Sequence, residues 1–207
     1  MELTLELSFL APADWRVLRA ARLRALLDSP HAFTSSYARE SHWGKFEWRR
    51  VFATATCIVA REAEKVIGLA KSVAEPFRPR MRHLESVWVA PTHRRRGVLR
   101  ALLHDLAEID RPMGVTELML WVLEDNYNAQ RAYEALGFEP TGERQFLLAA
   151  GRFERRLRLI LDRLQDSDLT GRRFRVDCDS TELGQRPGLE LQEIHRVPDA
   201  AHIVDLI

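Results

Sequence analysis

The chain contains little cysteine. Its 207 residues include two cysteines, Cys57 and Cys178, which lie far apart and match no common metal-binding spacing. The sequence therefore gives no sign of a disulfide framework, and a reducing compartment is the simplest expectation.

Long apolar runs and an excess of charge of either sign are also absent. No apolar run reaches the length that crosses a membrane, and residues 1–7 carry acid where a signal peptide carries lysine or arginine. The 31 basic and 30 acidic residues leave a formal net charge of +1, whereas nucleic-acid-binding domains usually show a marked basic excess. We therefore expect a soluble, cytoplasmic protein that acts on neither membranes nor nucleic acid.

What is present is the composition of a globular protein with a substantial core, since 46% of the residues are hydrophobic and 29% are charged. Clear apolar periodicity ends near Asp162, and Gly, Pro, Asp and Arg accumulate beyond it. We expect one domain over residues 1–161. Residues 162–207 are expected to form a C-terminal appendage that is either disordered or docked on the body or on another subunit.

Strand-like and helix-like patterns alternate through residues 3–161. The patterns predict strands at 3–9, 56–60, 66–73, 84–89, 117–123, 138–148 and 153–161, and helices at 12–28, 35–52, 98–109 and 126–136. Alternation of this kind predicts a mixed α/β sheet with helices on both faces.

The most informative segment joins the strand at 84–89 to the helix that follows it. It contains three consecutive arginines, Arg94, Arg95 and Arg96, and then Gly97. A strand–turn–helix unit directs backbone N–H groups, the positive end of a helix dipole and cationic side chains at one place, and Gly97 lets a ligand approach the backbone. The segment predicts a phosphate site. A solvated basic turn or a weak nucleic-acid patch is the alternative.

This segment resembles a known motif. Residues 87–98, Val-Trp-Val-Ala-Pro-Thr-His-Arg-Arg-Arg-Gly-Val, resemble the acetyl-CoA-binding motif of the GNAT superfamily of N-acetyltransferases, which reads Arg or Gln, two residues, Gly, one residue, and Gly or Ala. A second block, from Asn126 through Ala129 and Tyr133 to Phe138, is similar to the family's Asn-x-x-Ala-x-x-x-Tyr…Gly-Phe segment. The likeness follows the family's element order over residues 3–161. The chain departs from the pattern at Leu99.

The resemblance implies a fold and a ligand. The implied fold is a mixed central sheet of about six to seven strands with helices on both faces, in which two parallel strands, Val87–Val89 and Leu118–Val122, splay apart to form the coenzyme A cleft. The implied cosubstrate is acetyl-CoA, with no metal. The residues expected to bind it are Val87, Trp88, Val89, Arg94, Arg95, Arg96, Gly97, Val98, Leu99, Arg100, Asn126 and Tyr133. The side chain of Leu99 would have to point away from the phosphates.

The implied reaction moves an acetyl group from acetyl-CoA to a primary amine, by direct attack in a ternary complex. The amine must first lose a proton, and a carboxylate is the natural base. Glu85 is the first candidate and Glu124 the second, although either could be a surface carboxylate paired with an arginine. Tyr133 stands where the family places the residue that protonates the departing thiolate, and its alternative role is packing on Phe138. Asn126 also suits a helix N-cap.

The acceptor cannot be read from the sequence, although a small-molecule amine is favoured over a protein amine. A homodimer is left open. A non-catalytic acyl-CoA-binding sensor or interaction domain on the same fold is the main alternative function, and a nucleic-acid-binding module built on the arginine clusters at 78–82 and 94–96 is a weaker one.

Overall fold

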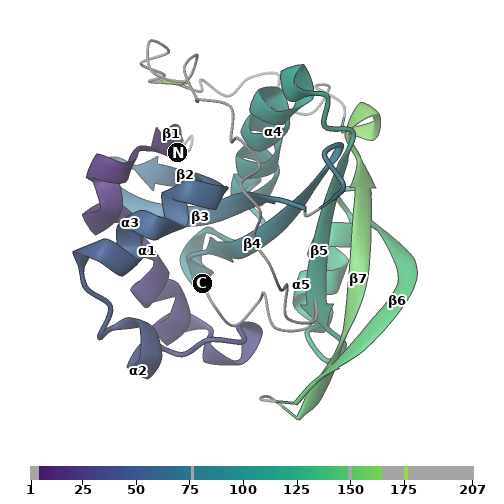
Figure 1. Ribbon diagram of the computed structural model, residues 1–207, viewed down its shortest axis with the longest axis horizontal. Helices are drawn as coiled ribbons and strands as arrows, with labels where there is room; N and C mark the ends of the chain where they lie inside the picture. The colour runs from purple at the N-terminus through teal and green to yellow at the C-terminus, as the bar shows by residue number, and fades with distance from the viewer. Residues whose placement is uncertain (1–4, 76, 149–150, 165–174, 177–207) are drawn as a thin grey trace.

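The computed structural model describes residues 5–75, 77–148, 151–164 and 175–176. The strands are β1 (Glu6–Leu10), β2 (Ala55–Glu62), β3 (Lys65–Ala74), β4 (Met81–Val89), β5 (Glu117–Leu123), β6 (Glu139–Leu147), β7 (Arg152–Ile160) and β8 (Arg175–Val176). The helices are α1 (Trp15–Asp28), α2 (Tyr37–Glu40), α3 (Lys45–Thr54), α4 (Val98–Asp110) and α5 (Tyr127–Glu134) (Figure 1). In the described part of the chain, none of these helices combines the length and the apolar character that crossing a bilayer requires.

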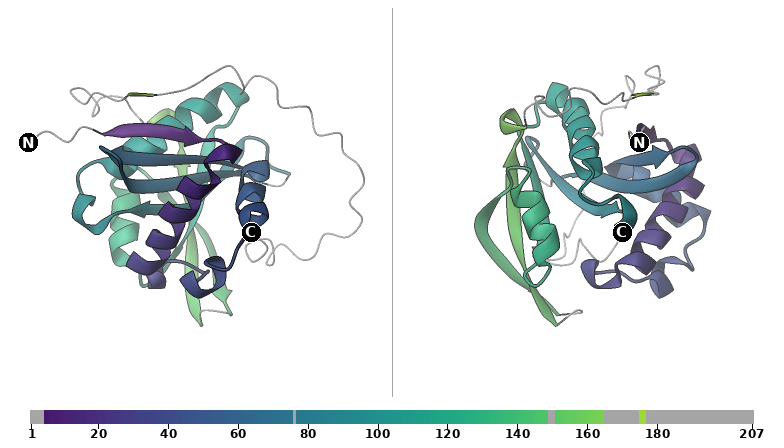
Figure 2. Two further views of the ribbon diagram at one scale, coloured as in Figure 1. Left: turned by 90° about the vertical axis from the view of Figure 1, so that its left-hand side faces the viewer. Right: turned by 180° about the vertical axis from the view of Figure 1, so that it is seen from behind.

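The strands form one sheet, in the order β6-β7-β5-β4-β3-β2-β1-β8. The pairs β4–β5 and β1–β8 are parallel, and the other neighbours are antiparallel. Helices α1, α2 and α3 cover one face of the sheet, and α4 and α5 cover the other (Figures 1 and 2). This arrangement confirms the expected mixed sheet with helices on both faces. The eighth strand is only two residues long and comes from the segment expected to be an appendage.

The predicted elements are confirmed with small shifts at their ends, except for the helix expected at 35–52. That prediction is wrong, because the segment is divided into α2 and α3. Gly44 lies between them with an extended backbone (φ −85°, ψ −175°) and is the N-cap of α3, and its N–H donates to the Glu47 carboxylate at 2.9 Å. A new helix start therefore interrupts a pattern that looks continuous in the sequence.

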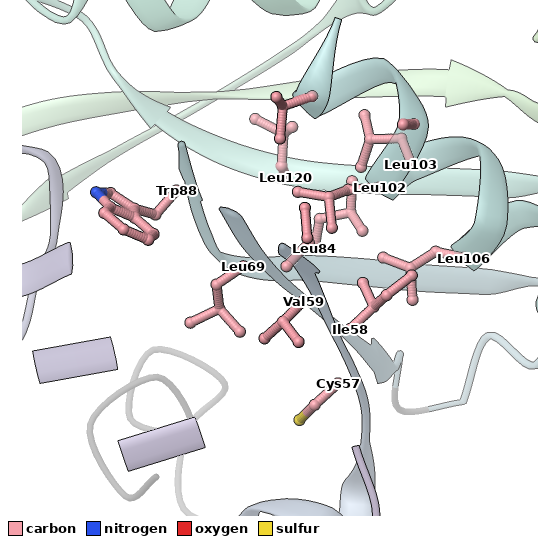
Figure 3. Packing of buried hydrophobic residues seen from close by; sticks show 14 of the residues in the cluster. Cys57, Ile58, Val59, Leu69, Leu84, Trp88, Leu102, Leu103, Leu106 and Leu120 are labelled. Carbon is pink, nitrogen blue, oxygen red and sulfur yellow. The ribbon is translucent and has the colours of Figure 1, made fainter. Parts of the chain in front are cut away.

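Helix α4 packs very closely on the centre of the sheet. Its inner face buries Leu102, Leu103 and Leu106, which gather over the sheet in Figure 3. Gly68 of β3 makes this close packing possible, since a Cβ atom there would lie 3.0 Å from both Leu102 Cδ1 and Val98 Cγ1. The absence of a side chain at this one position thus fixes how deeply the first turn of α4 sits.

Strands β4 and β5 separate after a short parallel contact. Their pairing joins only Met81–His83 to Glu117–Met119, so no strand of the described chain pairs with the β5-facing edge of β4 beyond His83. The expected splay is therefore confirmed.

A β-bulge accompanies the splay. Along β3, Lys71 pairs with Glu85 and Leu69 pairs with Trp88, so a single residue of β3 faces two residues of β4. Within the bulge Ser86 adopts a left-handed backbone with φ +54°. Such an insertion bends the strand and changes the direction of its side chains.

Candidate active site

The turn after β4 has the geometry of an anion site. Gly97 has φ +83° and caps the N-terminus of α4, and Arg95 is also left-handed with φ +60°. In the first turn of the helix, the N–H groups of Val98 and Leu99 precede the amide of Ala101, which donates to the Gly97 carbonyl. Together with the helix dipole they favour a negatively charged group.

The Arg94 side chain makes two contacts within the protein. Its Nε donates to the carbonyl oxygen of Val89 at 3.1 Å, and its Nη2 donates to Ser29 Oγ at 3.0 Å. The guanidinium group therefore links the end of β4 to the residue after α1.

Leu99 and His93 stabilise the turn from the inside. Leu99, where the chain departs from the GNAT pattern, is partly buried and packs against the hydrophobic core. The imidazole of His93 is buried, with Nε2 2.9 Å from Glu62 Oε2 and Nδ1 2.8 Å from Thr92 Oγ1. Sequence reasoning did not find the contact with Glu62, because it joins residues far apart in the chain.

A cleft lies between the helices on one face of the sheet and the splayed strands. One wall comes from α1, α3 and the loop after α1, and includes Phe33, Trp43 and Trp48. The other wall comes from β4, β5, β7 and α5, and includes Glu85 and Tyr133. The splay thus brings both first-choice catalytic candidates to one cavity.

Glu85 points into this cleft from β4. Its Oε2 lies 2.7 Å from Nζ of Lys71, and the Glu85 side chain keeps 30% of its surface exposed. Lys71 is 5% exposed and lies directly across the sheet from Glu85. The ion pair fixes the position of the carboxylate and leaves its second oxygen for another partner.

Glu124, the second candidate base, lies in a different environment. Arg144 donates to both of its carboxylate oxygens, at 2.7 and 2.8 Å. These hydrogen bonds lower the pKa of the Glu124 carboxyl below its usual range. Glu124 is not among the described residues that line the cleft. A carboxylate held in this way is a weaker base than one without such partners.

Tyr133 lies in the wall of the cleft and is 9% exposed. Burial raises the pKa of its hydroxyl above the usual value, so the group keeps its proton at neutral pH. Its ring also packs edge-on against Phe138, with the centroids 5.4 Å apart. The packing role considered from the sequence is thus observed, and the position of Tyr133 in the cleft wall is compatible with the catalytic one. Asn126 caps the same helix, since its Oδ1 accepts a hydrogen bond from the Ala129 N–H at 3.2 Å.

Besides Lys71 and the Arg22–Glu40 pair, sequence reasoning also missed His83 and Glu154 in the cleft. Burial lowers the pKa of the His83 imidazole, so it is neutral at pH 7. Glu154 is 5% exposed, accepts a hydrogen bond from the Gln145 amide, and has a pKa raised by burial. Neither residue belongs to a motif, because only the pairing of the strands brings them to the cleft.

The sequence model of the Acetyltransferase (GNAT) family matches residues 21–138. Human N-acetyltransferase 8 is 32% identical over 95 residues, which are 44% of this chain and 42% of that protein. The matched region therefore spans less than half the length of this curated relative.

Solved structures of similar fold include spermidine N-acetyltransferase from Vibrio cholerae in complex with CoA and spermine. It is 18% identical, with 79% of this chain and 99% of that chain covered at a TM-score of 0.60. Another is yncA from Salmonella typhimurium with acetyl-CoA, 20% identical, with 77% and 95% covered at a TM-score of 0.61. At these identities the likeness shows a shared fold. Together with the family match over more than half of the sequence, it leads to one conclusion: the chain belongs to the GNAT acetyltransferase family.

Proposed function

We propose that the protein transfers an acetyl group from acetyl-CoA to a primary amine within a ternary complex. One observation carries this proposal: a carboxylate, Glu85, and a protonated phenol, Tyr133, line the same cleft where β4 and β5 separate. A proton acceptor and a proton donor are the two groups that acetyl transfer from a thioester to an amine requires.

The turn and the splayed strand fit the parts of coenzyme A. The main-chain amides of residues 95–100, opened by the left-handed backbone of Gly97, would hold the pyrophosphate. The edge of β4 at Val87–Val89, which pairs with no described strand on the β5 side, would hold the pantetheine arm, with Asn126 and Tyr133 contributing from α5. When bound, acetyl-CoA supplies the acetyl group in the activated form of a thioester.

The side chains of the cleft would then handle the protons. Glu85 accepts the proton that the acceptor amine must lose, and Lys71 holds the Glu85 carboxylate in place. Tyr133 donates its hydroxyl proton to the sulfur as the carbon–sulfur bond breaks. Glu124 is the second candidate base. We rank it below Glu85 because its ion pair with Arg144 makes the carboxylate less basic.

We also propose a small-molecule acceptor and a cytoplasmic location. The structurally similar enzyme from Vibrio cholerae was solved with spermine, a small amine, and the cleft of this chain is lined by side chains from the helices and from the splayed strands. Cys57 is a buried free thiol, which is compatible with a reducing compartment.

Replacement of Gly97 by leucine tests the phosphate assignment. A bulky side chain at this position would block the approach of the pyrophosphate. We expect the Michaelis constant for acetyl-CoA to rise at least tenfold, which corresponds to about 1.4 kcal/mol. The measurement is release of free thiol at varied acetyl-CoA, with the binding constant for CoA from calorimetry beside it.

Gly114 provides the matched control. It has φ +80°, close to that of Gly97, and a Cβ atom there would meet no other atom within 4 Å. Gly114→Leu therefore introduces the same backbone strain away from the turn at residues 94–97. It should leave the Michaelis constant for acetyl-CoA unchanged. An unaltered Michaelis constant for acetyl-CoA in Gly97→Leu would contradict the phosphate assignment. Failure of the unmodified protein to bind any coenzyme A species would refute the proposed function.

A further inference from the structure

The charges in the cleft do not balance. Besides Tyr133, which keeps its proton, six ionisable side chains line it: Arg22, Glu40, Lys71, His83, Glu85 and Glu154. The two cations are already paired with carboxylates. Arg22 donates to both oxygens of Glu40, at 2.7 and 2.9 Å, and Lys71 lies 2.7 Å from Glu85. Since His83 is neutral, one carboxylate is left over.

That carboxylate is Glu154. Its only hydrogen-bond donor in the described part of the chain is the neutral amide of Gln145, and no described cation lies within 4.0 Å of it. The residue is 5% exposed and comes from β7, where it pairs with Leu123 of β5. Burial without a cation disfavours the charged form of Glu154 and raises its pKa, and a ligand that brings a positive charge would offset this cost.

We propose that Glu154 binds the ammonium group of the acceptor and that the cleft selects amines that carry no carboxylate. This inference rests on the proposed function and names the acceptor class for the same site. An acceptor with a carboxylate beside its amine would bring a second negative charge to a cleft whose cations, Arg22 and Lys71, are already neutralised. Glu154 is thus a specificity-determining residue, while Glu85 takes the proton.

The remaining walls indicate the body of the acceptor. Phe33, Trp43, Trp48 and Trp121 are among the side chains that line the cleft. These aromatic side chains offer apolar contact surface within a cleft whose exposed surface is otherwise mostly polar. An aralkyl amine combines the required positive charge with an apolar body.

Phenethylamine and phenylalanine form the test pair, because they differ only in the carboxylate. With saturating acetyl-CoA, we expect kcat/KM for phenethylamine to exceed that for phenylalanine at least tenfold. In Glu154→Gln, kcat/KM for phenethylamine should fall about tenfold, mainly through a higher KM, so that the ratio between the two acceptors shrinks. The KM for acetyl-CoA should stay unchanged.

A control variant, Glu139→Gln, and a binding measurement by tryptophan fluorescence complete the test. Glu139→Gln removes a carboxylate from the neighbouring strand β6, where Glu139 is exposed and pairs with Arg163 at 2.6 Å, and should alter neither acceptor. Trp43 and Trp48 line the cleft, so quenching of tryptophan fluorescence reports phenethylamine binding even without turnover. Thermal melts establish that each variant is folded.

The outcomes separate the two proposals. The inference about Glu154 is overturned if phenylalanine is acetylated or bound as well as phenethylamine. It is also overturned if Glu154→Gln leaves kcat/KM and KM for phenethylamine unchanged. A protein that binds acetyl-CoA but neither binds nor acetylates phenethylamine overturns it as well. A protein that does not bind acetyl-CoA overturns the proposed function, while fluorescence titration with the two acceptors still decides the role of Glu154.

Discussion

At the scale of single residues, Tyr133 shows how burial prepares a group for catalysis. The surrounding apolar side chains raise the pKa of its hydroxyl, so the group can donate a proton but does not ionise at neutral pH. Tyr133→Phe keeps the ring and its packing on Phe138 and removes only the donor. We expect kcat to fall about a hundredfold, the lower end of what a general acid contributes. The KM for acetyl-CoA should remain nearly constant in a thiol-release assay.

Tyr127 is a suitable comparison for this variant. It lies on the same helix as Tyr133, but its side chain is exposed. Tyr127→Phe should therefore retain the original turnover. Normal turnover in Tyr133→Phe would remove the hydroxyl from the mechanism and leave Tyr133 a packing role only.

The sequence indicated some site residues and concealed others for a physical reason. Gly97 was predictable because a left-handed helix cap strongly favours glycine within a recognisable local motif. Lys71 and Glu154 were not, since each meets its partners across the sheet and has no local pattern of its own. Arg94 was correctly placed in the turn, but its contact with Ser29 depends on where α1 ends.

At the scale of elements, the packing of α4 on β3 depends on Gly68. A methyl group there would overlap with Val98 and Leu102 at 3.0 Å. We expect Gly68→Ala to lower the free energy of unfolding by about 1–3 kcal/mol, as overpacking usually does. Chemical denaturation measures this change. The Michaelis constant for acetyl-CoA should rise as well, because the displaced first turn of α4 carries the main-chain amides proposed to bind the pyrophosphate.

A double-mutant cycle with Val98→Ala provides the check. Removal of the Val98 methyl groups makes room for a methyl group at residue 68. Gly68→Ala should therefore cost less in the Val98→Ala background than in the original chain. Strictly additive costs would show that the two positions do not compete for the same space.

Element order was the most predictable level of the fold. Apolar periodicity located the strands and most helices because each has one buried face. It failed at Gly44, where bulky residues on both sides of a helix start gave the appearance of one continuous helix. The β-bulge was equally hidden, since nothing in the letters of residues 84–89 marks the left-handed backbone of Ser86.

At the scale of the whole molecule, the body of the protein extends to Leu164. Leu161 and Leu164 are buried in the core, and Arg111 Nη2 donates to their carbonyl oxygens at 3.0 and 3.4 Å. We expect a chain that ends at Leu164 to fold and to bind acetyl-CoA like the full chain. Calorimetry and a thermal melt measure both properties.

The same truncation tests the proposed appendage from residue 165 onward, since residues 162–164 stay with the body. It removes β8, which pairs with β1 through Arg175 and Val176. Two residues of strand pairing contribute little, so the expected loss of stability is small. Failure of the shortened chain to fold would show that the C-terminal segment is part of the domain.

The bulge in β4 has a consequence for the length of the strand. Glu85 and Trp88 are three positions apart and would face opposite sides of a regular strand. The additional residue makes them face the same side, where the Arg24 guanidinium of α1 lies 5.2 Å from the Trp88 ring. Deletion of Ser86 would move each later side chain of β4 to the opposite face of the sheet. The indole of Trp88 would then leave the core. The surface loops of such a protein can gain or lose residues over evolution, but the residue count of this strand is fixed.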